Sequence, residues 1–220
     1  MHIPHRQHFE RVDLSTPAFA PWLMVMVGLL AMTGCATRTL STGQPAGAPI
    51  PSSGSTLAVV PFENLSHNRN AGLILTDLAT TLVYEQDKLR VIEVSQVPDN
   101  ELRLRRLEVS PWERQIGVNT AAGVEVGRAL EVQWVLVGSV GEYGFVDGFG
   151  ETANVGITLR LVRVEDGRVA WAGSLSRRAA CGAFSEESVH RLGHEVLREL
   201  LGAMFRDLPR DETIVVDPAT

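Results

Sequence analysis

The stretch VQWVLVGSV at residues 132–140 does most to limit the folds open to this chain. The stretch is apolar on both of its faces, as a central strand would be, so a strand formed there must be covered on both sides. A strand of that kind lies in the middle of a sheet with packed layers on either side. The stretch therefore predicts an α/β fold rather than an exposed antiparallel sheet.

The segments around it supply the other elements of such a fold. Strands are expected at 57–62, 89–94, 132–140, 154–161 and 168–175. Helices are expected from about Ala71, within 96–131, and at about 185–206, where Val189, Leu192, Val196, Leu200 and Met204 repeat at helical spacing. The order β-α-β-α-β-β-β-α predicts a single-domain α/β layer sandwich: a mixed β-sheet of about five strands with packed helices.

The clearest local signal is VEDGRV at 164–169, where Asp166-Gly167 stands between valine-rich arms. This dipeptide is typical of a two-residue β-hairpin turn. The pattern after the turn predicts that Trp171 is buried on the same face of the sheet as Val169.

The N-terminal region carries a second strong signal. An apolar run at 18–34 ends in Met32-Thr33-Gly34-Cys35, which resembles the bacterial lipobox, where small residues precede a lipid-modified cysteine. By that resemblance, residues 1–34 are a lipoprotein signal peptide and Cys35 carries the lipid. Ala36 follows in place of the aspartate that retains such proteins in the inner membrane, which implies an outer-membrane anchor facing the periplasm. The alternative is an uncleaved membrane anchor with an incidental cysteine.

The composition after Cys35 predicts the domain boundaries. Residues 35–56 are rich in Ser, Thr, Gly and Pro and are expected to form a lipidated flexible tether. The α/β domain is expected at 57–206 and a C-terminal tail at 207–220.

Charge and cysteine content exclude several functions. The net charge is -6, and no run of Lys and Arg marks a nucleic-acid surface. The two cysteines, Cys35 and Cys181, exclude a disulfide framework and a cysteine-rich zinc site. Cys181 is either a small buried side chain or the source of an intermolecular disulfide.

No segment predicts catalysis or a cofactor. GSVGEYG at 138–144 follows a strand, but no helix pattern comes after it to hold a phosphate. His190 and His194 have the i, i+4 spacing of a metal pair, yet they are only weak candidate ligands because they lie on the flank of the last helix. We therefore expect no enzyme activity, no catalytic residue and no cofactor; a metal-dependent enzyme is the alternative.

Four stretches in order carry a family resemblance: LAVVPFENLS with GLILTDLATTLV, LRVIEV, AAGVEVGRALEVQWVLVGSVGEYG, and VGITLRLVRVEDGRVAWAG. The pattern resembles the curli assembly and secretion lipoproteins (CsgG-like) and the related penicillin-binding-protein activator lipoproteins. The resemblance implies a non-enzymatic envelope protein that binds other proteins, often as an oligomer of identical copies. It implies either a role in envelope assembly or secretion or, alternatively, activation of a peptidoglycan synthase.

The chain departs from the secretion channels of that family in one respect. Their two membrane hairpins need roughly 20 residues or more each, whereas the two links at 147–151 and 176–187 are shorter. We therefore expect the periplasmic domain without its pore. The loops at 63–70 and 147–151 have no assignable core role, so Arg69 and Phe149 are the candidate protein-binding residues.

Overall fold

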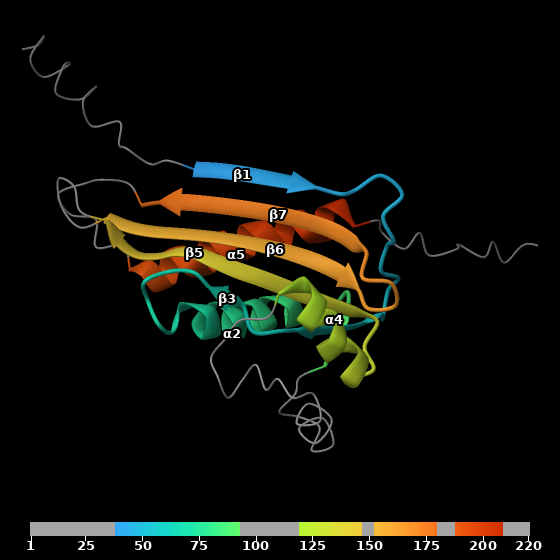
Figure 1. The fold of residues 1–220 in the computed structure, drawn as a ribbon. Helices are drawn as coiled ribbons and strands as arrows, with labels where there is room; N and C mark the ends of the chain where they lie inside the picture. Colours follow the sequence, from blue (N-terminus) through green and yellow to red (C-terminus); the bar gives the residue numbers. More distant parts are fainter. Residues whose placement is uncertain (1–37, 93–118, 147–151, 180–187, 209–220) are drawn as a thin grey trace, which may run out of the picture. The chain divides into compact units, whose positions relative to one another are not determined.

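The computed structural model describes residues 38–92, 119–146, 152–179 and 188–208. Its strands are β1 (Arg38–Gly43), β2 (Thr56–Val59), β3 (Glu63–Asn64), β4 (Arg90–Val91), β5 (Trp134–Val146), β6 (Thr152–Arg163) and β7 (Val169–Arg178). Its helices are α2 (Ala71–Tyr84), α4 (Thr120–Ala129) and α5 (Val189–Asp207). The described strands form one sheet in the order β1-β7-β6-β5-β2-β4, with β3 beside β5 (Figure 1).

The sheet is mixed, as the sequence predicts. Strands β5, β6, β7 and β1 pair antiparallel in turn, whereas β2 pairs parallel with β5 and with β4. Helices α2 and α5 pack on one face and α4 packs on the other. The α/β class and the single mixed sheet are therefore confirmed.

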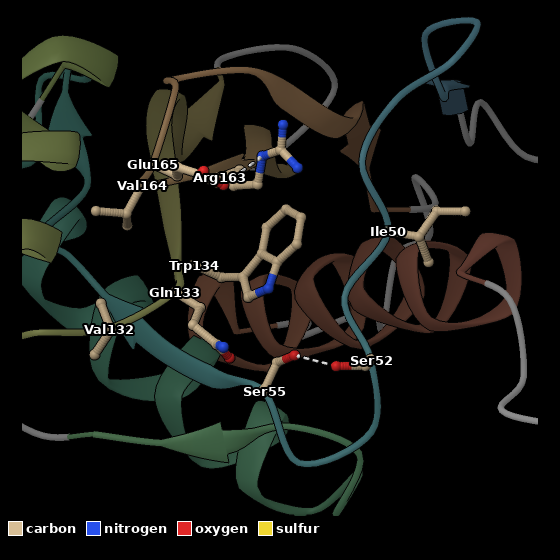
Figure 2. Close-up of a pocket in the computed structure, with 9 residues that line it drawn as sticks. All are labelled: Ile50, Ser52, Ser55, Val132, Gln133, Trp134, Arg163, Val164 and Glu165. Atoms are coloured by element: carbon tan, nitrogen blue, oxygen red, sulfur yellow. Dashed lines mark hydrogen bonds and ion pairs between the residues drawn. The ribbon is translucent and has the colours of Figure 1, made fainter.

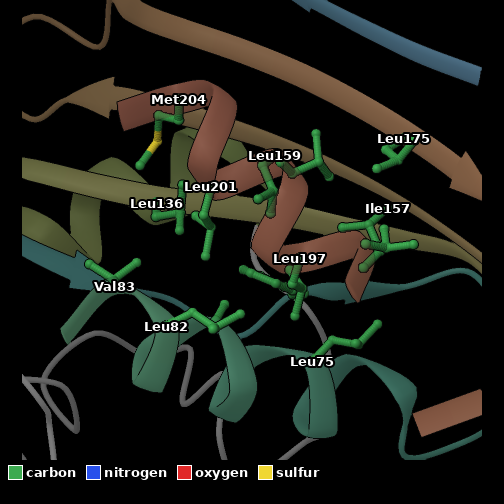
Figure 3. Close-up of a cluster of buried hydrophobic side chains, with 14 of the residues drawn as sticks. Leu75, Leu82, Val83, Leu136, Ile157, Leu159, Leu175, Leu197, Leu201 and Met204 are labelled. Atoms are coloured by element: carbon green, nitrogen blue, oxygen red, sulfur yellow. The ribbon is translucent and has the colours of Figure 1, made fainter. Parts of the chain in front are cut away.

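The larger core lies between the sheet and the pair α2 and α5. The predicted stripe of α5 is confirmed, because all five of its residues are buried. Figure 3 shows side chains of α5 such as Leu197 and Leu201 between those of α2 and those of the strands. The helical period places the buried residues of α5 on one side of the helix, where they form a single apolar surface against the core.

A second, smaller core lies under α4 on the opposite face. Val135 and Val137 of β5 point into it, while Leu136 points into the larger core. This alternation explains why the consecutive residues 134–137 are all apolar. Gly127 lets α4 approach the sheet closely, since a Cβ there would lie 2.6 Å from Cγ2 of Val164.

The register of β7 corrects one prediction. Trp171 is fully buried, as expected, but it lies in the larger core, whereas Val169 packs against the core under α4. Leu161 stands opposite Trp171 and Val162 opposite Val169, so Ala170 is an extra residue in β7. A bulge of this kind shifts the alternation by one position and sends the two side chains to opposite faces.

The β6–β7 hairpin forms where predicted, but its loop is longer than two residues. The backbone N–H of Arg163 donates to the carbonyl of Arg168 at 2.9 Å, which leaves four residues, 164–167, in the loop. Gly167 has φ +71°, the left-handed conformation that glycine adopts readily. The Asp166 carboxylate accepts a hydrogen bond from the Arg168 backbone N–H at 3.1 Å, and this bond stabilises the loop.

Strand β1 corrects the prediction of a flexible tether. Residues 38–43 pair antiparallel with β7 along their whole length, despite their Ser/Thr/Gly content. Edge pairing depends on backbone hydrogen bonds, which need no apolar side chain. An ion pair between Arg38 and Glu199 of α5 also holds the strand. The folded part therefore begins before residue 57, and only Ala36 and Thr37 separate Cys35 from the sheet.

Among the described residues, no helix is both long enough and apolar enough to cross a bilayer.

Candidate functional site

A pocket of about 370 Å³ lies at the end of the sheet where β2 and β5 begin. Three segments form its wall: residues 50–55 before β2, residues 132–134 at the start of β5, and residues 163–165 at the β6–β7 hairpin (Figure 2). The segment before β2 is fixed to the hairpin, because the Arg168 guanidinium donates to the carbonyl of Gly47 at 2.7 Å. We call this end of the sheet the hairpin end.

Trp134 occupies the middle of the pocket. Figure 2 shows its indole ring in the space between Arg163, Ile50 and Ser55. The side chain is 4% exposed, whereas that of Ile50 is 50% exposed. The pocket thus has a fixed aromatic floor and an accessible aliphatic side chain at its rim.

Hydrogen bonds fix the polar part of the wall. The Gln133 side-chain carbonyl accepts from the Thr56 backbone N–H at 3.2 Å, and the Gln133 backbone N–H donates to the Thr56 hydroxyl at 3.0 Å. Ser52 and Ser55 share a hydrogen bond of 3.0 Å between their hydroxyls. Apolar rings with a few fixed polar groups are typical of sites that bind a small molecule or a peptide side chain.

The charged side of the pocket is internally paired. The Arg163 guanidinium donates to the Asp166 carboxylate, with 3.0 Å between Nε and Oδ1, and Glu165 lies 3.9 Å away. The hydrogen bond from Arg163 lowers the pKa of Asp166 from its ordinary 3.8 to about 2. The same hydrogen bond raises the pKa of Arg163. Arg163 therefore stays charged but is neutralised by its two carboxylate neighbours.

This ion pair predicts a specific pH dependence. Because the folded pKa of Asp166 lies below the unfolded value, its stabilising effect is present above about pH 4 and is lost as the pH falls through about 2. We expect Asp166→Asn to lower the melting temperature slightly at about pH 5, since exposed ion pairs contribute little. Thermal unfolding should show this difference shrinking as the pH falls from about 4 and vanishing only below about 2; a difference that is the same at pH 5 and below pH 2 would contradict the prediction.

A second surface is the polar face of β5, β6 and β7, on the side away from α5. In the described ranges only α4 packs on this side, towards the hairpin end (Figure 1). Thr158 donates to Ser174 at 3.1 Å, and Ser176 donates to Glu142 at 2.8 Å. We call this polar layer, in which hydroxyl groups and the Glu142 carboxylate share hydrogen bonds, the hydroxyl face.

The predicted protein-binding residues lie elsewhere. Arg69 is exposed in the loop between β3 and α2, at the opposite end of the sheet from the pocket. The Asn64 side-chain amide donates to the carbonyls of Asn68 at 2.7 Å and of Arg69 at 3.1 Å, so this loop has a fixed local structure. Phe149 lies outside the described residues, and its pairing with Arg69 stays a prediction.

The weak metal candidates, His190 and His194, both lie in the described part of α5. His190 is exposed in the first turn of α5, and His194 Nε2 lies 3.3 Å from an Arg198 guanidinium nitrogen. In the part of the chain that the structure describes, no group of three His, Cys, Asp or Glu side chains is suited to a metal ion. Cys35 and Cys181 lie outside that part.

The glycines of GSVGEYG have structural positions. Strand β5 continues through Gly138, Gly141 and Gly144 to Val146 with no helix start among them. A Cβ at Gly138 would lie 2.7 Å from Cδ1 of Phe62, so this glycine makes room for an aromatic ring. A register shift between Val140 and Glu142 leaves Gly141 as the extra residue of a bulge.

Sequence reasoning missed the pocket. Trp134 was assigned only to a strand, and Ile50 lay in a segment interpreted as a tether. The signal available was Ile50 itself, a large apolar residue between two prolines in an otherwise small and polar segment.

No family model and no curated protein matches the chain. The fold is similar to the PelC dodecamer from Paraburkholderia phytofirmans, with a TM-score of 0.55 and 18% identity over 79% of this chain and 99% of that chain. Lipoprotein GNA1162 from Neisseria meningitidis is less similar, with a TM-score of 0.49 and 20% identity over 69% of this chain and 96% of that chain. The LpoB C-terminal domain from Escherichia coli has a TM-score of 0.45 and 17% identity over 59% of this chain and 87% of that chain.

At these identities the likeness to PelC shows a shared fold and nothing about activity or partners. None of the three structures is a curli secretion protein, so the curli part of the sequence resemblance has no counterpart here.

Proposed function

We propose that the protein is a non-enzymatic lipoprotein, anchored through Cys35 in the outer membrane and facing the periplasm, which acts by binding other envelope proteins. The observation that carries this proposal is the pocket at the hairpin end. It places the exposed side chain of Ile50 beside the ring of Trp134 and the guanidinium of Arg163, and aromatic and arginine side chains are enriched in protein interfaces. Its walls are fixed by hydrogen bonds, so little ordering is needed when a partner binds.

The partner that we expect is a peptidoglycan synthase of the penicillin-binding type. The support is the sequence resemblance to activator lipoproteins, which covers most of the folded part. The length of the predicted tether gives no support, because β1 takes up residues 38–43 and leaves only Ala36 and Thr37 in the sequence between Cys35 and the sheet. A synthase anchored in another membrane would therefore have to span most of the distance between the two membranes itself.

Self-association is a further part of the proposal. PelC, whose fold this chain shares, is a dodecamer by its description. The hydroxyl face formed by β5, β6 and β7 is uncovered over much of its area in the described ranges, so a second copy has room to pack there. The same capture experiment tests both kinds of partner.

In this experiment, the lipoprotein is used as bait in envelope extracts that also contain a differently tagged copy of itself. We expect a penicillin-binding protein, identified by mass spectrometry, among the captured proteins. The double variant Ile50→Asp with Glu165→Arg should reduce that capture at least about tenfold, since a buried interface charge costs more than 1.4 kcal/mol. Both side chains are well exposed, so folding should be unaffected.

Ser174→Arg on the hydroxyl face is the matched control for synthase capture and the test variant for self-capture. Synthase capture that is equal for wild type and the pocket variant would overturn the pocket assignment. Absence of any penicillin-binding protein from the wild-type capture would overturn the proposed partner.

A further inference from the structure

The start of β1 determines how near the folded part lies to the lipid anchor. Cys35 is three residues before Arg38, the first residue of β1. At 3.8 Å between successive Cα atoms, this link spans at most about 11 Å. With Cys35 acylated, as the proposed function requires, the beginning of β1 must remain close to the membrane surface.

The register of the sheet shows which other residues lie at this end. Arg38 stands opposite Arg177, Arg177 opposite Val155, and Val155 opposite Tyr143. Phe145 lies two residues further along β5, beyond the row that contains Arg38. We call this end of the sheet, at which β1 begins and β5 and β7 end, the anchor end (Figure 1).

Helix α5 begins at the anchor end as well. Its Glu195 pairs with Arg177 at 3.0 Å, and Gly193 packs where an added Cβ would meet Tyr143 at 3.3 Å. Its other end lies at the hairpin end, where Asp207 accepts from the Trp171 indole N–H at 2.9 Å. Strand β6 has twelve residues, so the two ends of the sheet are about 40 Å apart.

The two most exposed large apolar side chains of the described residues both lie towards the anchor end. Leu65 is 64% exposed and Phe145 is 57% exposed. The Leu65 backbone N–H donates to the carbonyl of Val140 at 2.9 Å, which places Leu65 beside β5 just after β3. Arg69 lies in the loop that follows. Exposed apolar side chains beside basic ones are the groups that a lipid headgroup layer binds.

We propose that the anchor end is a membrane-docking surface: Phe145 and Leu65 insert among the phospholipid headgroups, and the sheet points away from the bilayer. Docking in this orientation carries the pocket at the hairpin end about 40 Å into the periplasm. It also places Arg69 at the membrane rather than on a protein partner. The proposal rests on the lipid anchor of the proposed function and adds an orientation to it.

The test uses two positions on one helix. His190 and Arg206 are both exposed on α5 and are separated by about 24 Å along its axis. A fluorophore is attached to His190→Cys or to Arg206→Cys in a Cys181→Ser background, and each acylated protein is reconstituted in vesicles of phosphatidylethanolamine and phosphatidylglycerol with spin-labelled headgroups. We expect several-fold stronger quenching at position 190 than at position 206.

A second part of the experiment distinguishes binding of the anchor end to lipid from closeness that the short link to Cys35 alone imposes. A flexible insert of about 20 Gly and Ser residues between Thr37 and Arg38 lengthens the link to a relaxed reach of about 25 Å. We expect the stronger quenching at position 190 to persist with the insert and to disappear when Leu65→Ser and Phe145→Ser are added. Both side chains are exposed, so their replacement should leave the melting temperature unchanged.

The outcomes are distinct. Equal quenching at both positions, or stronger quenching at position 206, would overturn the proposed orientation. The anchor end would then be available to bind a protein, which is the role predicted for Arg69. Loss of the difference on inserting the linker alone would overturn lipid binding by Leu65 and Phe145. The mass of the purified protein reports acylation of Cys35 separately, so a failed anchor is not mistaken for a failed orientation.

Discussion

Replacing Trp171 with alanine should lower the free energy of unfolding by about 3–5 kcal/mol, the usual cost of emptying a large buried aromatic site. The indole is fully buried, and its N–H donates to the Asp207 carboxylate at 2.9 Å. Gly173 leaves room for the ring, since a Cβ there would lie 2.3 Å from Cη2 of Trp171. The ring therefore fills a space built for it between β7 and α5.

Urea denaturation followed by far-ultraviolet circular dichroism measures this loss. Asp207→Ala is the matched control, because it removes the hydrogen bond and leaves the ring in place, at a cost of about 1 kcal/mol. A loss below about 1 kcal/mol for Trp171→Ala would mean that the ring contributes little to the core.

Replacing Cys35 with serine should remove the protein from the outer-membrane fraction almost completely. A serine hydroxyl does not take the place of the thiolate in the lipid transfer, and stable anchoring of a folded domain needs its acyl chains. The measurement is fractionation of the envelope together with the mass of the protein from each fraction. Wild type should carry acyl groups, and the variant should carry none.

Cys181→Ser is the matched control for this prediction. It replaces the other cysteine by the same residue and should leave the location of the protein unchanged. An unacylated wild-type protein, or a Cys35→Ser protein that still fractionates with the outer membrane, would refute the lipid anchor.

The α/β class was predictable because strong periodicity and burial coincide in this chain. Val135 and Leu136 belong to different cores, and the sequence encodes this two-sided burial as consecutive apolar residues at 134–137. The stripe of α5 was predictable for the same reason, since its residues recur at the period of the helix. A pattern of apolar residues shows which side chains are buried when the chain folds, and both of these features depend on burial.

Features that depend on the backbone were not predictable in this way. Strand β1 is held by pairing with β7, and its Ser, Thr and Gly residues resemble those of a linker. The bulge at Ala170 moves Val169 to the face opposite Trp171. The residue types around Ala170 do not predict this bulge. Both errors have one cause, because hydrogen bonds between strands are formed by groups that every residue carries.

The pocket was missed because tertiary contacts alone bring its three walls together. Ile50 and Glu165 are more than 100 residues apart in the chain, yet they face the same Trp134. Arg69, in contrast, was correctly expected on an exposed loop. Its distance from the pocket depends on the course of the chain through the sheet, which no local pattern reveals.

The position of β1 has a mechanical consequence. If Cys35 is lipidated, as proposed, a pull between the membrane and the rest of the molecule enters the fold at Arg38 and acts along the axis of a six-residue strand. Because β1 lies beside β7 over that whole length, the load is shared by all of their hydrogen bonds at once instead of breaking them one after another. The ion pair of Arg38 with Glu199 reinforces the first residue to be loaded. The proposed anchor would thus pull along the direction in which an edge strand best resists being drawn out of its sheet.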